Sequence, residues 1–373
     1  MLTRRSFATL LGGAPAAFAA KASKKCLVYF GTYTRNGSQG IYVSRLDAAS
    51  GNVSEPELAA EIANPSFVAL HPNGKHLYSV TETGPAGIVT SFNIHRDSGK
   101  LTKLNSTPSK GTGPCHLNVD KTGHTLVVAN YNSGSVAALP VNADGSLGES
   151  ASFIQHKGSS ADPRRQQGPH AHSVNISSDG RYVICADLGM DQVLVYKFDA
   201  AKSTLTANDP PFASVKPGSG PRHFTFHPNG KYAYVINEML STVTAFQWDA
   251  SRGVLKELHT ISTLPADFKG NNSTAEVVAH SNGKFLYGSN RGHNSLAVFS
   301  IGGDGRLKHL GNVSTQGEVP RNFAIEPGGK WLLAANQNTN NVVGFSIDAT
   351  GMPKPTGQTL KVGAPVCVRY LAI

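Results

Sequence analysis

Alternating apolar and polar positions run along most of the chain in short segments separated by turn residues. In "PRHFTFHPNGKYAYVINE", residues 221–238, two alternating runs flank an "HPNG" turn. A period of two predicts β-strands, and a glycine-containing turn between two such runs predicts a hairpin. Related stretches begin at Pro65, Pro114, Ala171, Thr274 and Pro320, at intervals of 46 to 57 residues. The chain therefore contains at least six copies of one hairpin.

Further strands follow each hairpin. Runs such as "QVLVYKF" and "TVTAFQW" supply a third strand in most copies, and a "D-x-x-x-G-x-L" turn leads to a more variable fourth strand. Four strands in each repeat of about 50 residues are typical of propeller blades. The N-terminal "CLVYFGTYTRNGSQGIYVSRLDAASGNVSEPEL" contains the later strands of one more blade, and the C-terminal "APVCVRYLAI" resembles its missing first strand.

The pattern thus predicts an all-β fold, a seven-bladed β-propeller with four antiparallel strands per blade. The last blade is closed by strands from the N- and C-terminal ends, which removes an open sheet edge. We expect residues 20–373 to form this single domain.

The first residues differ from the rest. "MLTRRSFATLLGGAPAAFAA" has a basic start, an apolar middle and small residues at its end, as secretory signals do. Arg4 and Arg5 match the twin-arginine type, and Ala17–Phe18–Ala19 offers a cleavage site. We expect residues 1–19 to be an export signal and the mature protein to be periplasmic or extracellular. No later segment is long and apolar enough to span a bilayer, so no stable membrane insertion is expected after cleavage.

Composition narrows the class of partner. The formal net charge is +10, yet lysine and arginine are spread along the chain rather than gathered in runs. That distribution argues against a nucleic-acid partner. We interpret the charge as a general property of a basic surface, which also suits small anionic ligands. The four cysteines form no CxxC pair and lie in apolar runs, so buried free thiols are expected. The oligomeric state is left open.

Comparing the copies separates scaffold from function. The copies are aligned on the glycine of the turn, which is Gly74, Gly123, Gly180, Gly230, Gly283 and Gly329. The residue seven positions later is Asn or Asp in five of the six copies, and we interpret this position as structural. The residues eight positions before and eight after the glycine do not repeat, so they are candidates for function.

Four of these varying residues form the candidate site. They are His172, Arg222, Glu238 and Arg291. Because each hairpin brings the start of one strand beside the end of the next, we expect Arg222 and Glu238 to face each other at one mouth of the channel. Arginines bind carboxylates and oxyanions, and a nearby carboxylate or imidazole activates water. A purely structural Arg222–Glu238 ion pair is the alternative.

Two other features concern a metal and a lid. His170 and His172 in "HAH", together with His116, His223 and His293, could approach a metal, but no carboxylate or cysteine spacing supports one, and no metal is expected. The polar loop 157–170 is long enough to lean over the channel mouth and bring Arg164 and Arg165 there, although a plain surface loop is more common.

The repeat, with "PRHFTFHPNGKYAYVINE", "HAHSVNISSDG", "PCHLNVDKTGHTLVVANYNSGSV" and "SNRGHNSLAVFSI", resembles the lactonase family of seven-bladed β-propellers. The resemblance covers nearly the whole chain after the signal. It implies an active-site quartet of His172, Arg222, Glu238 and Arg291. Arg321, Glu82 and His116 are secondary candidates for substrate binding at the same mouth.

The resemblance implies a cofactor-independent hydrolase that opens a sugar-type lactone such as 6-phosphogluconolactone. An export signal weakens the phosphorylated substrate, because phosphorylated sugar lactones are chiefly intracellular. Two alternatives stay open, a muconate-type cycloisomerase acting on a dicarboxylate and a non-catalytic exported propeller that binds a small anionic ligand. The choice of His172 or Glu238 as the base also stays open.

Overall fold

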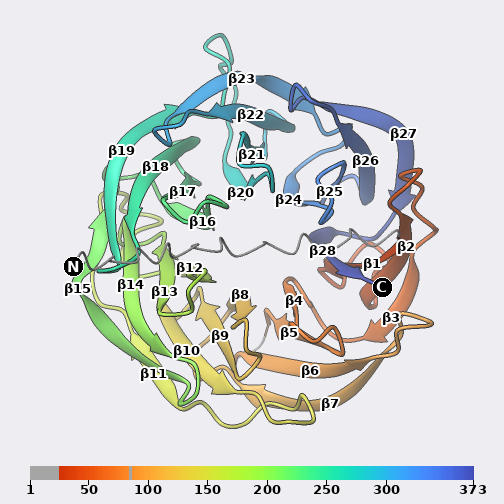
Figure 1. Cartoon of the computed structure of the whole chain (residues 1–373), viewed down its shortest axis with the longest axis horizontal. Helices are drawn as coiled ribbons and strands as arrows, with labels where there is room; N and C mark the ends of the chain where they lie inside the picture. Colours follow the sequence, from red (N-terminus) through yellow and green to blue (C-terminus); the bar gives the residue numbers. More distant parts are fainter. Residues whose placement is uncertain (1–24, 84–85) are drawn as a thin grey trace, which may run out of the picture.

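The computed structural model describes residues 25–83 and 86–373, which form seven four-stranded antiparallel sheets around a central channel (Figure 1). From the innermost strand outward, the sheets are β28 (Pro365–Ala372), β1 (Lys25–Thr32), β2 (Gly40–Asp47) and β3 (Glu57–Glu61); β4 (Val68–Leu70), β5 (His76–Thr81), β6 (Ile88–Ile94) and β7 (Leu101–Pro108); β8 (Pro114–Val119), β9 (Thr125–Asn130), β10 (Ser135–Pro140) and β11 (Ser152–Gln155); β12 (Ala171–Ile176), β13 (Tyr182–Asp187), β14 (Gln192–Asp199) and β15 (Thr204–Ser214); β16 (Pro221–Phe226), β17 (Tyr232–Asn237), β18 (Thr242–Asp249) and β19 (Val254–Ser262); β20 (Thr274–Ala279), β21 (Phe285–Asn290), β22 (Ser295–Ile301) and β23 (Leu307–Ser314); β24 (Pro320–Ile325), β25 (Trp331–Asn336), β26 (Asn341–Ile347) and β27 (Pro353–Lys361). The predicted seven-bladed propeller is confirmed.

The closing blade joins the two ends of the chain. The C-terminal strand β28 is its innermost strand and pairs with β1, from Cys26 opposite Ala372 to Thr32 opposite Pro365 (Figure 1). The inner edge of β1 is therefore paired rather than open, as predicted. Within the described residues, no helix combines the length and apolar character needed to cross a membrane. The predicted signal at residues 1–19 lies outside the described residues.

The turn glycines behave as the sequence predicts. All six have a positive φ, between 67° and 81°, which favours glycine. In the turn after β16, the Gly230 N–H donates to the His227 carbonyl at 2.9 Å and closes the turn.

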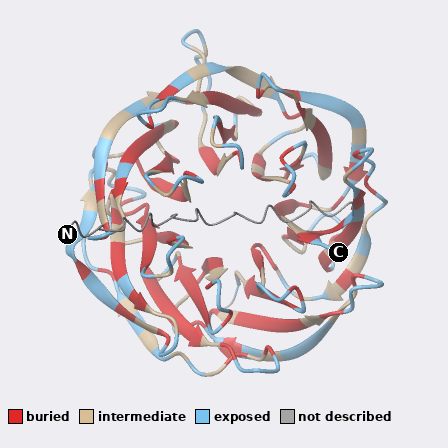
Figure 2. Cartoon of the chain, in the orientation of Figure 1, coloured by how far each residue is buried: buried red, intermediate tan, exposed pale blue. Residues whose placement is uncertain are grey.

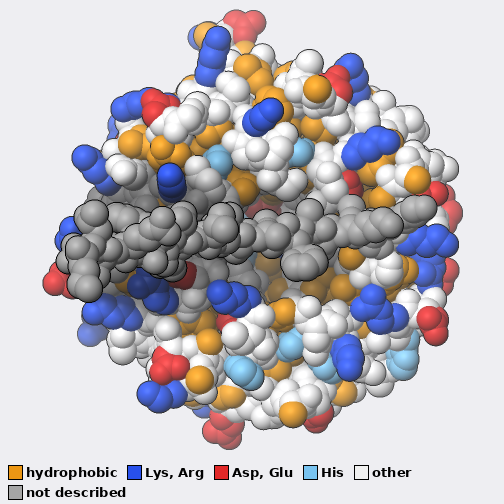
Figure 3. All heavy atoms as spheres, viewed as in Figure 1, with side chains coloured by type: hydrophobic (Ala, Val, Ile, Leu, Met, Phe, Trp, Pro, Cys, Tyr) orange, Lys and Arg blue, Asp and Glu red, His pale blue; other side chains and the backbone are white. Residues whose placement is uncertain are grey.

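Apolar residues of adjacent blades pack together between the sheets. Phe224 of β16 and Val235 of β17, for example, belong to a cluster that also contains Val193 and Val195 of the preceding blade. Inner and middle strands are mostly buried, whereas the outermost strands carry the exposed positions (Figure 2). On one face of the ring, lysine and arginine side chains stand as separate groups interspersed with acidic and uncharged ones (Figure 3).

A β-bulge at the start of the innermost strand corrects one expectation. Pro221 pairs with Asn237 and His223 pairs with Ile236, so Arg222 is an extra residue without an opposite partner. Arg222 and Glu238 are therefore not opposite each other in the strand register, contrary to what the count from the turn glycine predicts, although their side chains do meet. The same irregularity leaves an extra residue at Cys115, His172, Arg321 and Val366. A bulge re-aims side chains, and here it brings both Arg222 and His223 into contact with the channel.

Candidate functional site

Glu238 is the centre of the site, and the backbone fixes its position. It follows the last residue of β17, and its N–H donates to the Gly220 carbonyl at 2.7 Å. The preceding Asn237 is fully buried and donates through Nδ2 to Thr242 Oγ1 at 2.9 Å. The structural role predicted for this asparagine position is confirmed. The side chain of the next residue, Glu238, takes no part in this hydrogen bond and contacts the arginines of the site instead.

Three guanidinium groups surround the Glu238 carboxylate. Arg222 Nε and Arg291 Nη2 lie 3.0 and 2.9 Å from Oε2, and Arg165 Nη2 lies 2.9 Å from Oε1. Burial alone would raise the pKa of Glu238, but Arg291, Arg222 and Arg165 together hold it at about 2. Glu238 is therefore ionised at neutral pH, and guanidinium groups contact both of its carboxylate oxygens.

Arg222 and Arg291 are also bound to the backbone. Arg222 Nη1 donates to the Ala275 carbonyl at 2.9 Å, and Arg291 Nη2 donates to the Thr274 carbonyl at 2.7 Å. Arg222 is buried despite its charge. These contacts build a rigid cationic frame around Glu238, and the predicted meeting of Arg222, Glu238 and Arg291 is correct.

The Arg321 guanidinium has hydrogen-bonding capacity that the described residues leave unused. In the described part of the chain its guanidinium makes no hydrogen bond or ion pair, and it stacks over the Tyr33 ring at 5.4 Å from the centroid. The Tyr33 hydroxyl donates to Glu82 Oε2 at 3.0 Å, which fixes the ring. Burial raises the pKa of Tyr33 to about 12, so the phenol stays protonated. Arg321 therefore presents an oriented fork for an anionic ligand.

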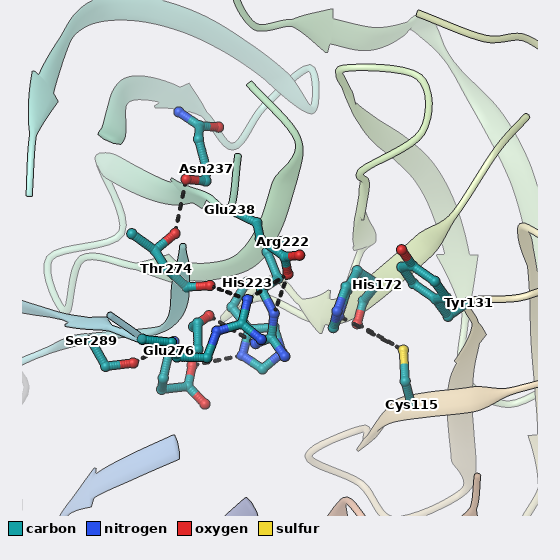
Figure 4. Close-up of polar contacts among 12 residues, drawn as sticks. Cys115, Tyr131, His172, Arg222, His223, Asn237, Glu238, Thr274, Glu276 and Ser289 are labelled. Carbon is teal, nitrogen blue, oxygen red and sulfur yellow. Dashed lines mark hydrogen bonds and ion pairs between the residues drawn. The ribbon is translucent and has the colours of Figure 1, made fainter. Parts of the chain in front are cut away.

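His172 joins the same region from the bulge of β12. Its Nδ1 lies 3.8 Å from the Cys115 Sγ, and its ring meets Tyr131 edge to face at 5.2 Å (Figure 4). Burial, followed by Arg222, holds the pKa of His172 well below its ordinary value. The imidazole is therefore neutral at physiological pH and can accept a proton.

A small niche lies between these side chains. Its volume is about 10 Å³, enough for about one water molecule. It is lined by Ser66, Phe67, Glu82, Cys115, His172, Arg222, His223, Arg321 and Val366. We call this niche and the surrounding Glu238, Arg291 and Arg165 the cup. The lining of the niche brings two neutral imidazoles, His172 and His223, and two guanidinium groups, Arg222 and Arg321, around a position of water size.

Tyr33, beside the cup, and Arg165, in it, lie outside the positions that the comparison of the copies selects. Tyr33 follows β1 at the point where Glu238 follows β17, but the closing blade has no turn glycine on which to align it. Arg165 comes from the loop at 157–170, whose length allows a lid, and its Nη2 also donates to the Tyr131 hydroxyl at 3.0 Å. Arg164 in the same loop is exposed and contributes no side-chain contact to the cup.

The loop that carries Arg165 is anchored at several points. Asp187 accepts from the His170 N–H at 2.8 Å and lies 2.6 Å from His156 Nδ1, so one carboxylate holds both ends. Asp162 Oδ1 accepts from the Arg165 N–H at 2.8 Å, and Gln166 Nε2 donates to the Leu188 carbonyl at 2.8 Å. At Arg165, this anchored loop therefore agrees better with the predicted lid over the channel mouth than with a plain surface loop.

The other histidines do not join the cup. His116 lies deeper, where its Nδ1 accepts from the Val174 N–H at 3.3 Å, and it lines a separate cavity of about 430 Å³ in the far half of the channel. The expected placement of His116 at the same mouth is therefore wrong. His170 precedes β12 and stacks on Tyr131, so it does not share a strand face with His172. Across residues 25–83 and 86–373, no cluster of His, Cys, Asp or Glu is suited to a metal ion, and all four cysteines are buried and unpaired.

Comparisons with known proteins agree with the geometry. A family described as "Lactonase, 7-bladed beta-propeller" matches residues 27–370. The chain is 38% identical to a Bacillus subtilis protein named 6-phosphogluconolactonase over 349 residues, which cover 93% of this chain and 99% of that protein. A 6-phosphogluconolactonase of Formosa agariphila is 37% identical over 310 residues, covering 81% and 87%. The structure of the Pseudomonas aeruginosa periplasmic gluconolactonase superposes with a TM-score of 0.88 at 36% identity, covering 94% of this chain and 99% of that one.

Proposed function

Because the chain belongs to the lactonase family of seven-bladed β-propellers, we propose that it hydrolyses a sugar lactone in the cup. The observation that carries the proposal is the uncommitted Arg321 fork beside a water-sized niche lined by neutral imidazoles. Hydrolysis of an ester needs a positioned water, a proton acceptor and cations near the carbonyl oxygen that gains charge. The cup offers a position of water size, two imidazoles that can accept a proton and guanidinium groups beside them.

The charged residues divide these tasks. Arg321 and the part of Arg222 that lines the niche stabilise the oxyanion that forms on the lactone carbonyl. Glu238 holds the arginine frame in place, and guanidinium groups occupy both of its oxygens and hold its pKa at about 2, so it is too weak a base to take a proton from water. One of the two niche imidazoles, His172 or His223, accepts the proton from water.

The substrate class follows from the relatives and the proposed location. Two relatives are named 6-phosphogluconolactonase and one structural neighbour is a periplasmic gluconolactonase. The proposed export of this chain through residues 1–19, which places residues 20–373 in the periplasm or outside the cell, favours an unphosphorylated aldonolactone. No cofactor is required by this chemistry.

The test is a turnover assay on the purified protein. Glucono-1,5-lactone, its 6-phosphate and an aromatic lactone are each offered near neutral pH, and acid release is measured above the spontaneous rate. We expect the sugar lactones to open, with solvent oxygen from labelled water incorporated into the product acid. An isomer formed without uptake of water would instead identify a cycloisomerase, and tight binding without turnover would identify a binding protein.

A pair of variants links turnover to the cup. Arg321→Gln removes the uncommitted fork, and we expect kcat/KM to fall by about 10²-fold or more. Arg252→Gln, on an exposed turn outside the cup, serves as the matched control and should keep wild-type activity. Equal activity of both variants would show that Arg321 does not contact the reacting lactone.

A further inference from the structure

A second polar layer lies directly behind the cup, one residue deeper along the innermost strands. It contains Glu276 of β20 and Asn322 of β24, and His223 of β16, which also lines the niche, connects it to the cup; all three residues are buried. His223 Nδ1 lies 2.8 Å from Glu276 Oε1 (Figure 4). Of the two niche imidazoles, His223 is therefore the one bonded to a buried carboxylate.

The hydrogen bonds around Glu276 define which groups donate. Asn322 Oδ1 accepts from the Val368 N–H at 2.9 Å, so the amide of Asn322 must direct its Nδ2 toward Glu276 Oε2. Glu276 Oε1 also accepts from the Val277 N–H at 3.0 Å. Both carboxylate oxygens therefore already accept hydrogen bonds from N–H groups.

That arrangement selects one tautomer of His223. A carboxylate that accepts on both oxygens also accepts from His223, so Nδ1 carries the hydrogen and donates to Oε1. The other nitrogen, Nε2, then carries the lone pair. It points away from Glu276, on the side of His172 (Figure 4), and His223 lines the water-sized niche. The centroids of the His223 and His172 rings are 5.4 Å apart.

We propose that His223, oriented by Glu276, is the general base that activates water in the niche; this inference rests on the proposed lactone hydrolysis. Water loses a proton to His223 Nε2 as its oxygen bonds to the lactone carbonyl carbon. The carbonyl π electrons move to oxygen, beside Arg321 and Arg222. When the oxyanion collapses, the ring C–O bond breaks and the leaving ring oxygen takes the proton from His223. The product is a hydroxy acid, and the imidazole returns to its starting state.

The other candidate bases lack this arrangement. Both oxygens of Glu238 are occupied by arginines. His172 faces a thiol through Nδ1, and in the described part of the chain no carboxylate bonds to it. Glu276 gives His223 a fixed tautomer and a counter-charge for the imidazolium that forms during the step, as in other carboxylate–histidine pairs.

The surroundings of His223 keep it neutral before the reaction. Burial lowers its pKa well below the ordinary value, and Arg222, Arg369, Arg321 and Arg291 add to the effect. The titratable and charged groups around it are Arg222 on its own strand, His116 on β8, His172 on β12, Glu276 on β20, Arg291 after β21, Arg321 on β24 and Arg369 on β28. The imidazole is therefore available as a base at neutral pH.

The experiment measures kcat and KM for glucono-1,5-lactone across pH in His223→Gln, Glu276→Gln and His172→Gln proteins. We expect His223→Gln to lower kcat by about 10²–10⁴-fold with little change in KM. Glu276→Gln should lower kcat by about 10²-fold, because the tautomer is no longer fixed. It should also shift the acidic limb of the pH profile to lower pH, because the imidazolium loses its counter-charge. In His223→Ala, added imidazole should restore turnover, which a purely structural role would not allow.

His227→Gln is the matched control. His227 is also buried, but its Nε2 lies 2.8 Å from the Gly283 carbonyl at a turn, away from the cup. It should keep wild-type kcat.

The inference is overturned if the wild type hydrolyses the lactone while His223→Gln and Glu276→Gln stay within threefold of its kcat. If His223→Gln does not fold, Glu276→Gln, which keeps the side-chain volume, decides between the same two outcomes. A wild type without turnover on any lactone would remove the proposed function itself and this inference with it.

Discussion

Glu238 and Glu276 are both buried, lie in adjacent blades and face the same channel. Their surroundings nevertheless shift the pKa values of the two carboxylates in opposite directions. Glu238 meets three arginines, which hold its pKa at about 2 although burial opposes them. Glu276 meets a histidine and an amide, and burial raises its pKa despite Arg369. One carboxylate is paired with cations on both oxygens, whereas the other is hydrogen-bonded to a neighbouring imidazole. Separated pKa values of this kind mark separate tasks.

The difference extends to the two layers around them. The cup is dominated by cations and suits an anion or a developing oxyanion. The layer behind it holds hydrogen-bond donors and acceptors that fix one tautomer of His223. We therefore assign electrostatics to the outer layer and proton transfer to the inner one. Substitutions in each layer should therefore have different consequences.

The largest expected effect comes from Glu238→Gln. This change leaves Arg222 and Arg291 buried without their counter-charge, and we expect the free energy of unfolding to fall by about 3–5 kcal/mol. Glu276→Gln removes no salt bridge to arginine, but it places an amide N–H₂ donor opposite the Asn322 Nδ2 donor. We therefore expect the free energy of unfolding to fall by about 1–3 kcal/mol. Urea denaturation near neutral pH measures both values. Equal losses would show that the two glutamates do not differ as described.

The stability penalties of Glu238→Gln and Glu276→Gln should also depend differently on pH. The pKa of Glu238 is about 2 in the folded protein and about 4.3 in an unfolded chain, so its stabilisation is complete above about pH 4.3 and is lost on acidification toward pH 2. The penalty of Glu238→Gln should therefore shrink below about pH 4.3.

Glu276 should give the opposite trend. Its pKa is raised by folding, so the wild type gains stability from it as the pH falls. The penalty of Glu276→Gln should not shrink on acidification. Denaturation curves of both variants and the wild type between neutral and acidic pH provide the comparison. Parallel trends would contradict it.

A smaller effect is expected from the loop above the cup. Arg165→Gln removes the cation on Glu238 Oε1, but this arginine is 46% exposed, so solvent weakens its contribution. We expect kcat/KM to fall by about 3- to 10-fold, with a loss of stability below about 1 kcal/mol. Arg164→Gln, on the neighbouring exposed position, is the control and should change neither quantity. An equal effect of both would reduce the role of Arg165 to general surface charge.

Most of the fold was predictable because the hairpin repeats. Period-two alternation and the turn glycine recur in six copies, so the number of blades and the closing strands followed from the sequence. The meeting of His172, Arg222, Glu238 and Arg291 followed from positions where the copies differ. Simple hairpin geometry could not reveal the bulge that exposes both Arg222 and His223 to the channel. Nor could it place Arg165, whose loop lies outside the repeat and is held by hydrogen bonds from distant residues.

Tyr33 gives the smallest predicted effect, and it tests whether the outer layer depends on orientation as well as charge. Tyr33→Phe keeps the ring beneath Arg321 but removes the hydroxyl that donates to Glu82 at 3.0 Å. The ring loses one constraint, so we expect kcat/KM to fall by about 2- to 5-fold, which corresponds to about 1 kcal/mol or less. Tyr33→Leu, which also removes the aromatic face, should cost more. Steady-state kinetics on both variants decides, and identical values would show that the stacking of Arg321 on Tyr33 does not orient the fork.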